Sequence, residues 1–150
     1  MKKILALCLF MGCFMFSGNA QSFKFGAQGQ LLFDGSFFGV GGKGHYTFND
    51  QFAGQASFTY YFEEVTVWTL DLDVHYSGFN IGDVESFRLT PFAGLNIFNV
   101  SVFGVSANTT NLNLGINGTM PLGDSLEFFV EPKIILGSGS TLAIAAGVYF

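Results

Sequence analysis

Hydrophobic and polar residues alternate one by one along most of the chain after residue 22. The clearest case is residues 68–76, where WTLDLDVHY places each large apolar side chain at an even position and each charged one at an odd position. Successive side chains of a β-strand point to opposite faces, so this pattern predicts a strand with one apolar and one polar face. Turn residues separate segments of this kind, which predicts eight strands: 23–33, 40–48, 52–62, 68–76, 87–97, 111–119, 126–136 and 141–150.

The last segment, 141–150, reads TLAIAAGVYF and presents a row of apolar side chains on one face. Such a strand must be paired along both edges and covered on that face, and a closed sheet in a bilayer meets both needs. No apolar run after residue 20 is long enough for a transmembrane helix, so a closed sheet is the remaining way to cross a membrane. We therefore expect an all-β protein, an eight-stranded antiparallel up-and-down transmembrane β-barrel.

The charged residues support this interpretation, since none falls on a predicted apolar face. A Lys or Arg that faces lipid at mid-membrane costs about 2 to 4 kcal/mol, so a bilayer selects against it. The acidic residues outside the predicted strands fall in predicted turns. The residues expected to form a polar network inside the barrel are Lys24, Lys43, His45, Asp71, Asp73, His75, Arg88, Glu127, Glu131 and Lys133.

Aromatic residues gather near the ends of the predicted strands, as in the two interfacial belts of a membrane barrel. One belt would contain Phe33, Tyr60, Phe62 and Trp68. The other, on the side of both chain ends, would contain Phe23, Tyr46, Phe48, Phe52, Tyr76, Phe87 and Phe150.

Three places interrupt the pattern. The alternation loses its phase over residues 98–110, which could extend the preceding strand; we predict the longest outer loop there. Pro91 and Pro132 fall inside predicted strands, although proline has no N–H to donate to a ladder. We expect a bulge or a strand end at each of them.

Residues 1–20 have the three parts of a secretory signal peptide: Lys2 and Lys3, an apolar run, and small residues up to Ala20. The expected division is a signal peptide over 1–20 and a barrel over 21–150. Cleavage would remove both cysteines, Cys8 and Cys13, and with them any thiol chemistry. A lipoprotein signal acylated at Cys13 is the alternative, but the residues after it stay apolar.

The mature chain would keep four basic residues against the 11 acidic ones of the whole sequence. It has no basic stripe that could meet a phosphate backbone, so nucleic acid is not an expected partner. We expect no cofactor. A soluble ligand carrier of eight strands needs apolar residues inside and polar ones outside, which is the inverse of this pattern.

The interior of an eight-stranded barrel is about wide enough for its own side chains, so we expect a plugged core, with Arg88 and Asp73 as a pair. A narrow channel through the same charges is the alternative. His75 and Ser77, with Glu85 as a third member, superficially resemble a hydrolase triad. His45 and His75 could bind a metal only with an added carboxylate. Asp34, Glu63 and Glu64, with residues 98–110, could instead form a surface for a partner or for strand addition.

The signal peptide, the eight alternating strands, the segment RLTPFAGLNI at 88–97 and the ending AGVYF resemble the small outer-membrane β-barrel family of Gram-negative bacteria. The resemblance implies an outer-membrane location with both termini periplasmic, contact with outer-membrane lipid, and a C-terminal signal at Val148 and Phe150 that the outer-membrane assembly machinery reads. Members of that family serve in envelope integrity, in adhesion or in unknown roles, and some small outer-membrane barrels modify lipid A, which would be the substrate of the triad considered above. We expect a non-enzymatic monomer whose surface partner the sequence does not name.

Overall fold

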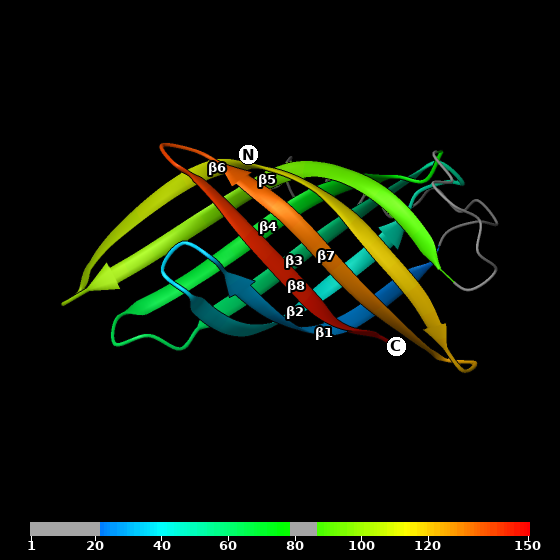
Figure 1. The fold of residues 1–150 in the computed structure, drawn as a ribbon, viewed down its shortest axis with the longest axis horizontal. Helices are drawn as coiled ribbons and strands as arrows, with labels where there is room; N and C mark the ends of the chain where they lie inside the picture. Colours follow the sequence, from blue (N-terminus) through cyan, green and yellow to red (C-terminus); the bar gives the residue numbers. More distant parts are fainter. Residues whose placement is uncertain (1–21, 79–86) are drawn as a thin grey trace, which may run out of the picture.

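The computed structural model describes residues 22–78 and 87–150, and every regular element in this part of the chain is a β-strand (Figure 1). The predicted signal peptide lies outside these residues and stays a prediction. Among the described residues, no helix is long and apolar enough to cross a membrane. The strands are β1 Phe23–Leu32, β2 Phe37–Thr47, β3 Phe52–Tyr61, β4 Thr66–Tyr76, β5 Arg88–Val102, β6 Val105–Leu122, β7 Leu126–Leu136 and β8 Ser140–Tyr149.

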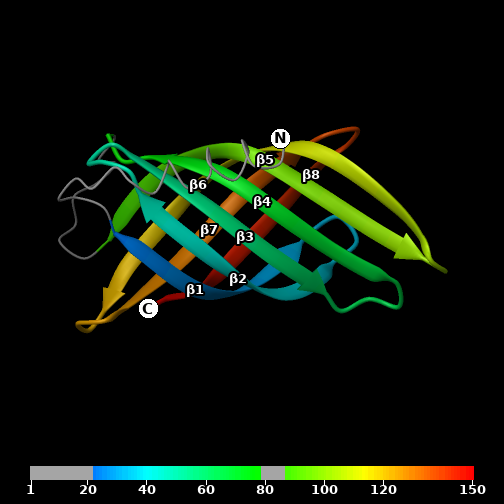
Figure 2. The same cartoon turned by 180° about the vertical axis from the view of Figure 1, so that it is seen from behind.

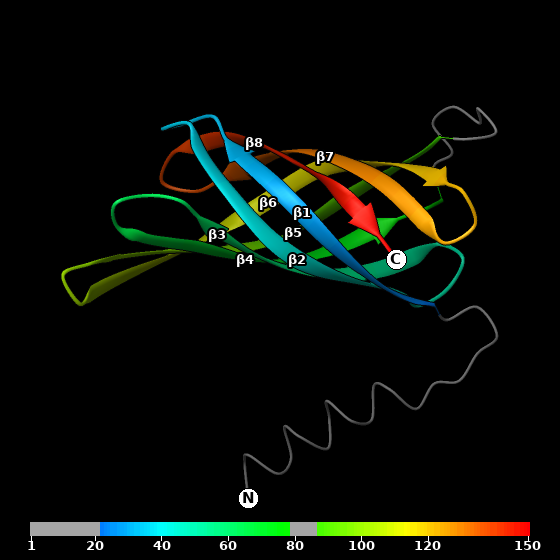
Figure 3. The ribbon, with the colours of Figure 1, turned by 90° about the horizontal axis from the view of Figure 1, so that it is seen from below.

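The eight strands form a closed antiparallel barrel in sequence order (Figure 2). The seam is made by β8 against β1, from Gly26 opposite Tyr149 to Leu32 opposite Ala143 (Figure 3). Closure pairs the last strand along both edges, as its apolar face required. We call the end that holds Phe23 and Phe150 the terminal end. The opposite end, where β1–β2, β3–β4, β5–β6 and β7–β8 are joined, is the hairpin end.

The two faces of each strand are those that the alternation predicts. In β4, Asp71 and His75 are buried inside the barrel, whereas Leu72 and Val74 on the outer wall are 46% and 53% exposed. The same holds around the barrel, where Phe25, Leu95 and Leu142 lie on the outside. The interior is polar and the exterior apolar, which is the inverse of a soluble carrier.

Aromatic side chains contact each other on the outer wall near both ends. At the terminal end, Phe52 and Tyr76 have ring centroids 5.1 Å apart. Towards the hairpin end, Phe58 and Trp68 are 5.8 Å apart, and Tyr60 lies 6.2 Å from Phe62. These contacts place aromatic residues at the two levels that the sequence predicted.

The predicted loop over residues 98–110 is wrong, because this segment is paired throughout. It completes β5 and begins β6, and Val102 lies opposite Val105 across a two-residue turn. Both turn residues, Phe103 and Gly104, have positive φ angles, 48° and 82°. Two such residues form the tight turn whose twist matches a hairpin, so the strands continue past the point where the alternation loses its phase. The result is a hairpin that projects beyond the other turns of the hairpin end (Figures 1 and 2).

The two prolines differ in their effect. At Pro91 the expected bulge or strand end is absent, because β5 continues to Arg88 and Pro91 lies opposite Ile116 of β6. Only the pairing with β4 stops beside it, at His75 opposite Phe92. At Pro132 the expected bulge or strand end is absent too. The paired residues of β6 and β7 pass from Gly115–Lys133 to Gly118–Val130 without a change of register. The missing proline N–H interrupts the ladder there and leaves the strand continuous.

Candidate functional site: the buried polar interior

The middle of the barrel holds a buried cluster around Asp71 of β4. Its carboxylate accepts hydrogen bonds from Lys133 Nζ at 2.7 Å, from Asn96 Nδ2 at 2.7 Å and from Asn113 Nδ2 at 2.9 Å. Asn113 also donates to Asp73 at 3.1 Å. The alternation of β4, β5, β6 and β7 brings these side chains to the barrel axis. A buried carboxylate is tolerated because a cation and several donors replace its water.

A second buried cluster lies next to the first, towards the terminal end, around Glu131 of β7. Lys43 of β2 forms an ion pair with it, Asn117 Nδ2 donates to it at 2.5 Å, and Gln55 Nε2 donates at 3.3 Å. Gln55 in turn accepts a hydrogen bond of 2.8 Å from the Tyr149 hydroxyl. This cluster connects β2, β3, β6, β7 and β8 across the barrel, so it ties opposite walls together.

Towards the hairpin end the interior becomes apolar. Leu32, Val67 and Ile135 are buried against the ring of Tyr61, which closes the interior above the charged clusters. The Tyr61 hydroxyl accepts a hydrogen bond of 2.6 Å from Gln30. Buried side chains therefore extend from the Glu131 cluster to this apolar layer.

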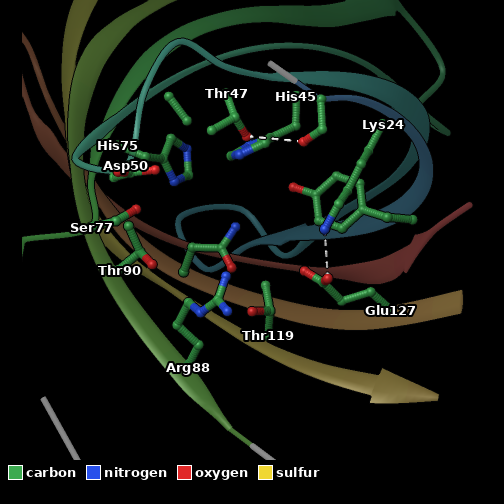
Figure 4. A pocket seen from close by; sticks show the side chains of 14 residues that line it. Lys24, His45, Thr47, Asp50, His75, Ser77, Arg88, Thr90, Thr119 and Glu127 are labelled. Atoms are coloured by element: carbon green, nitrogen blue, oxygen red, sulfur yellow. Dashed lines mark hydrogen bonds and ion pairs between the residues drawn. The ribbon is translucent and has the colours of Figure 1, made fainter. Parts of the chain in front are cut away.

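A hollow opens at each end of the barrel. The cavity at the terminal end has a volume of about 460 Å³ and is lined by Lys24, His45, His75, Arg88 and Glu127, among others (Figure 4). A cavity of about 390 Å³ lies at the hairpin end. The two ion-paired clusters lie between these cavities.

The expected pair of Arg88 with Asp73 is wrong. Asp73 lies opposite Gly94 across β4 and β5, six residues from Arg88, which is about 20 Å along a strand. Arg88 is exposed and points into the terminal cavity (Figure 4). Among the described residues it forms no ion pair. The third ion pair is instead Lys24 with Glu127, at 2.6 Å and half-exposed at the same mouth.

The two histidines lie together between the terminal cavity and the Glu131 cluster. Their ring centroids are 5.2 Å apart with nearly perpendicular planes, and His75 also stacks on Phe92 at 4.9 Å. Both nitrogens of His75 and Nδ1 of His45 lack a hydrogen-bond partner in the described part of the chain. Within residues 22–78 and 87–150, no group of three or more His, Asp or Glu is placed to hold a metal ion.

The triad considered from the sequence is not assembled in the described residues. His75 and Ser77 both line the terminal cavity, but no hydrogen bond joins them, since both nitrogens of His75 are without a partner. The proposed third member, Glu85, lies outside the described residues.

The amide side chains are the part of the site that the sequence analysis missed. It singled out charged residues and histidines, whereas Asn96, Asn113, Asn117 and Gln55 supply most of the donors to the buried carboxylates. A usable signal was present, because all four lie at polar-face positions of their strands. Amides on a buried face need partners as much as charges do.

Comparison with solved structures identifies the architecture. The chain aligns with the N-terminal β-barrel domain of Pseudomonas aeruginosa OprF at a TM-score of 0.73, with 20% identity over 87% of this chain and 97% of that domain. It has the fold of a small outer-membrane β-barrel. The neisserial surface protein NspA shares this fold at a TM-score of 0.56, with 16% identity over 87% of this chain and 98% of NspA. No protein-family model and no curated protein sequence matches the chain.

A third structure with the outer-membrane β-barrel fold is Ail of Yersinia pestis in complex with the heparin analogue sucrose octasulfate. Its TM-score is 0.52, with 18% identity over 87% of this chain and 97% of Ail. The predicted fold class, a closed barrel of eight antiparallel strands, is therefore confirmed. At these identities the likeness concerns the fold alone.

Proposed function

We propose that this protein is an integral outer-membrane β-barrel that does not conduct ions, and that it has a structural or surface role in the bacterial envelope. The observation that carries the proposal is the buried network around Asp71 and Glu131. Its side chains come from seven of the eight strands and occupy the cross-section of the barrel. A barrel of this size has room for side chains or for a channel, and the contacts of this network across the barrel support the first.

The outer wall supports a location in the membrane. Large apolar side chains cover it, and no charged residue of the described strands points outwards. Aromatic contacts lie near both ends of the wall, where an outer-membrane barrel carries its interfacial belts.

Both termini are proposed to be periplasmic. The support is the resemblance, which implies that Val148 and Phe150 form the signal read by the assembly machinery. In the structure Val148 lies on the outer wall opposite Ala27 and Phe128, and the Phe150 N–H donates to the Phe25 carbonyl oxygen at 2.9 Å. A membrane-impermeant thiol reagent should therefore label Asp34→Cys in intact cells and Asp124→Cys only in permeabilised cells. The reverse pattern would contradict this orientation.

We also propose that the barrel is a monomer and not an enzyme. The second part is supported by the lack of a hydrogen bond between His75 and Ser77 in the described residues, which a hydrolase triad requires. Overproduction should leave the mass spectrum of lipid A unchanged, and a new lipid A species that depends on His75 would refute this part.

Ail binds a sulfated ligand in its solved structure, so the charge at the hairpin end of this chain bears on whether a similar ligand suits it. The hairpin end of this chain carries Asp34, Glu63 and Glu64, and no Lys or Arg of the described residues lies there. Sulfate groups are bound by cations, so a sulfated saccharide does not suit this end.

Conductance in a planar lipid bilayer tests the closed interior. The purified protein should give no current steps above the lipid baseline. Reproducible steps from the unmodified protein would contradict the proposal. The double variant Lys43→Ala with Glu131→Ala removes the ion pair of one cluster only, so the Asp71 cluster and the layer around Tyr61 should still keep it free of current steps.

A further inference from the structure

One edge of the barrel is left open at the hairpin end. β6 pairs with β5 from Val105 to Thr119, but its pairing with β7 begins only at Leu112, opposite Leu136. Over residues 105–111 no strand in the described part of the chain covers the other side of β6. Alternate N–H and C=O groups of this stretch therefore point away from the barrel without a ladder partner.

The open edge lacks the features that usually protect such edges. Residues 105–111 read VSANTTN, with no charge, no proline and no glycine. The edge is also held extended from behind, because β5 is itself paired with β4 as far as Ser101, opposite Thr66. The edge is thus a rigid, uncharged template that another strand can pair with.

A hollow lies directly beside this edge. Thr109 and Asn111 of β6 line the hairpin-end cavity of about 390 Å³. Its apolar surface comes from Leu32, Phe37, Phe98 and Ile135. A strand added to β6 would place alternate side chains on the same side as Thr109 and Asn111, so these would point into the hollow.

The hollow also contains one carboxylate. Asp34, in the turn after β1, lines it and accepts only a long hydrogen bond of 3.4 Å from the Thr141 hydroxyl. No Lys or Arg of the described residues reaches this end. An apolar surface that leads to a lone carboxylate suits a Lys or Arg side chain, whose aliphatic stem packs on apolar groups while its charge stays at the wet end.

We propose that residues 105–111 of β6 and the hairpin-end hollow together bind an extended peptide strand that carries a basic side chain. The peptide pairs with β6 through its backbone, and one Lys or Arg runs over Leu32 and Phe98 to Asp34. The site is separate from the plugged interior, so peptide binding and ion conductance can succeed or fail independently.

The test uses the full-length barrel in lipid nanodiscs and a fluorescent heptapeptide of alternating Val and Thr with one central Lys. Fluorescence anisotropy should show saturable binding of this peptide. The same peptide with Glu in place of Lys, or with N-methyl groups on alternate amides, should bind at least about tenfold more weakly, because a charge-assisted contact or the backbone pairing is lost. Absence of binding, or equal binding of all three peptides, would overturn the proposal.

Two variants locate the site. Asp34→Asn should weaken binding of the Lys peptide by about tenfold, as expected for loss of one charged hydrogen bond. The matched control, Glu63→Gln, removes an acid from the same end outside the hollow and should leave binding unchanged. An equal effect of both variants would mean that general negative charge attracts the peptide, and would refute the site.

A second copy of the chain is the competing occupant. Light scattering of the purified protein in detergent should show a monomer, in agreement with an edge that is free for the peptide. A dimer that dissociates on substitution of Thr109 by Lys would show that the edge binds another barrel, and would overturn the peptide proposal.

Discussion

Two carboxylates, Asp71 and Glu131, are fully or nearly fully buried inside the barrel. Each is stabilised by one lysine and by amide groups from neighbouring strands. Removing one member of such a cluster leaves the others buried without partners, which costs far more than the pair itself contributes.

Glu131→Ala should therefore lower the free energy of unfolding by about 3 to 5 kcal/mol, because Lys43 and Asn117 lose their acceptor. Glu127→Ala is the matched control, since this residue pairs with Lys24 at the solvated mouth and should cost less than about 1 kcal/mol. Urea unfolding of the protein in lipid vesicles measures both values. Equal losses of unfolding free energy in the two variants would mean that Glu131 is as well hydrated as Glu127 at the mouth, which would contradict a dry buried cluster.

The sequence was sufficient to place these residues but not to pair them. Strand alternation correctly assigns Asp71, Glu131 and Lys133 to the interior, because side-chain direction depends only on position within a strand. Pairing depends on register and stagger, which put Asp73 opposite Gly94 and left Arg88 at the mouth. No local pattern contains that information.

Among the elements, the β5–β6 hairpin departs most from the sequence prediction. Residues 102–110 at its tip are all exposed, so the burial that maintains the hydrophobic alternation elsewhere is lost there. Backbone pairing continues to the Phe103–Gly104 turn all the same. The strand pattern thus predicts the part of each strand that lies in the barrel wall better than the part that projects beyond it.

Phe103 adopts a left-handed conformation that costs a phenylalanine about 1 to 2 kcal/mol. It is also fully exposed, so no packing offsets this cost. Phe103→Asn creates the Asn-Gly pair favoured in such turns and should stabilise the hairpin by about 1 kcal/mol. Hydrogen exchange of the amides of Val102 and Val105, which form the hydrogen-bonded pair next to the turn, should slow several-fold, and unchanged or faster exchange would contradict this turn geometry.

The two faces of β4 make a second prediction at this scale. Leu72 points outwards near the middle of the strand, so Leu72→Arg should cost about 2 to 4 kcal/mol and reduce membrane assembly. Leu122 also points outwards but ends β6, and Leu122→Arg should cost less than about 1 kcal/mol because its charge reaches the interface. Folding yield into vesicles measures both. A larger effect at Leu122 than at Leu72 would mean that the middle of the membrane lies near the end of β6 and not near the middle of β4, which would contradict this account.

At the scale of the whole molecule, the barrel has a polar interior and an apolar outer wall. The closure of β8 against β1 and the absence of outward charges from the described strands follow from the same alternation that predicted eight strands. The order and number of strands were therefore predictable. The two end cavities and the open edge of β6 were not, since they depend on unequal strand lengths that become visible only in the folded barrel.

The central claim is that this chain is a closed barrel in the outer membrane. The most direct measurement is fractionation of cells that express it, followed by gel electrophoresis with and without boiling. The structure predicts a band in the outer-membrane fraction whose mobility changes on heating, because a closed barrel resists detergent until it is boiled. A soluble periplasmic band with the same mobility in both lanes would contradict the claim.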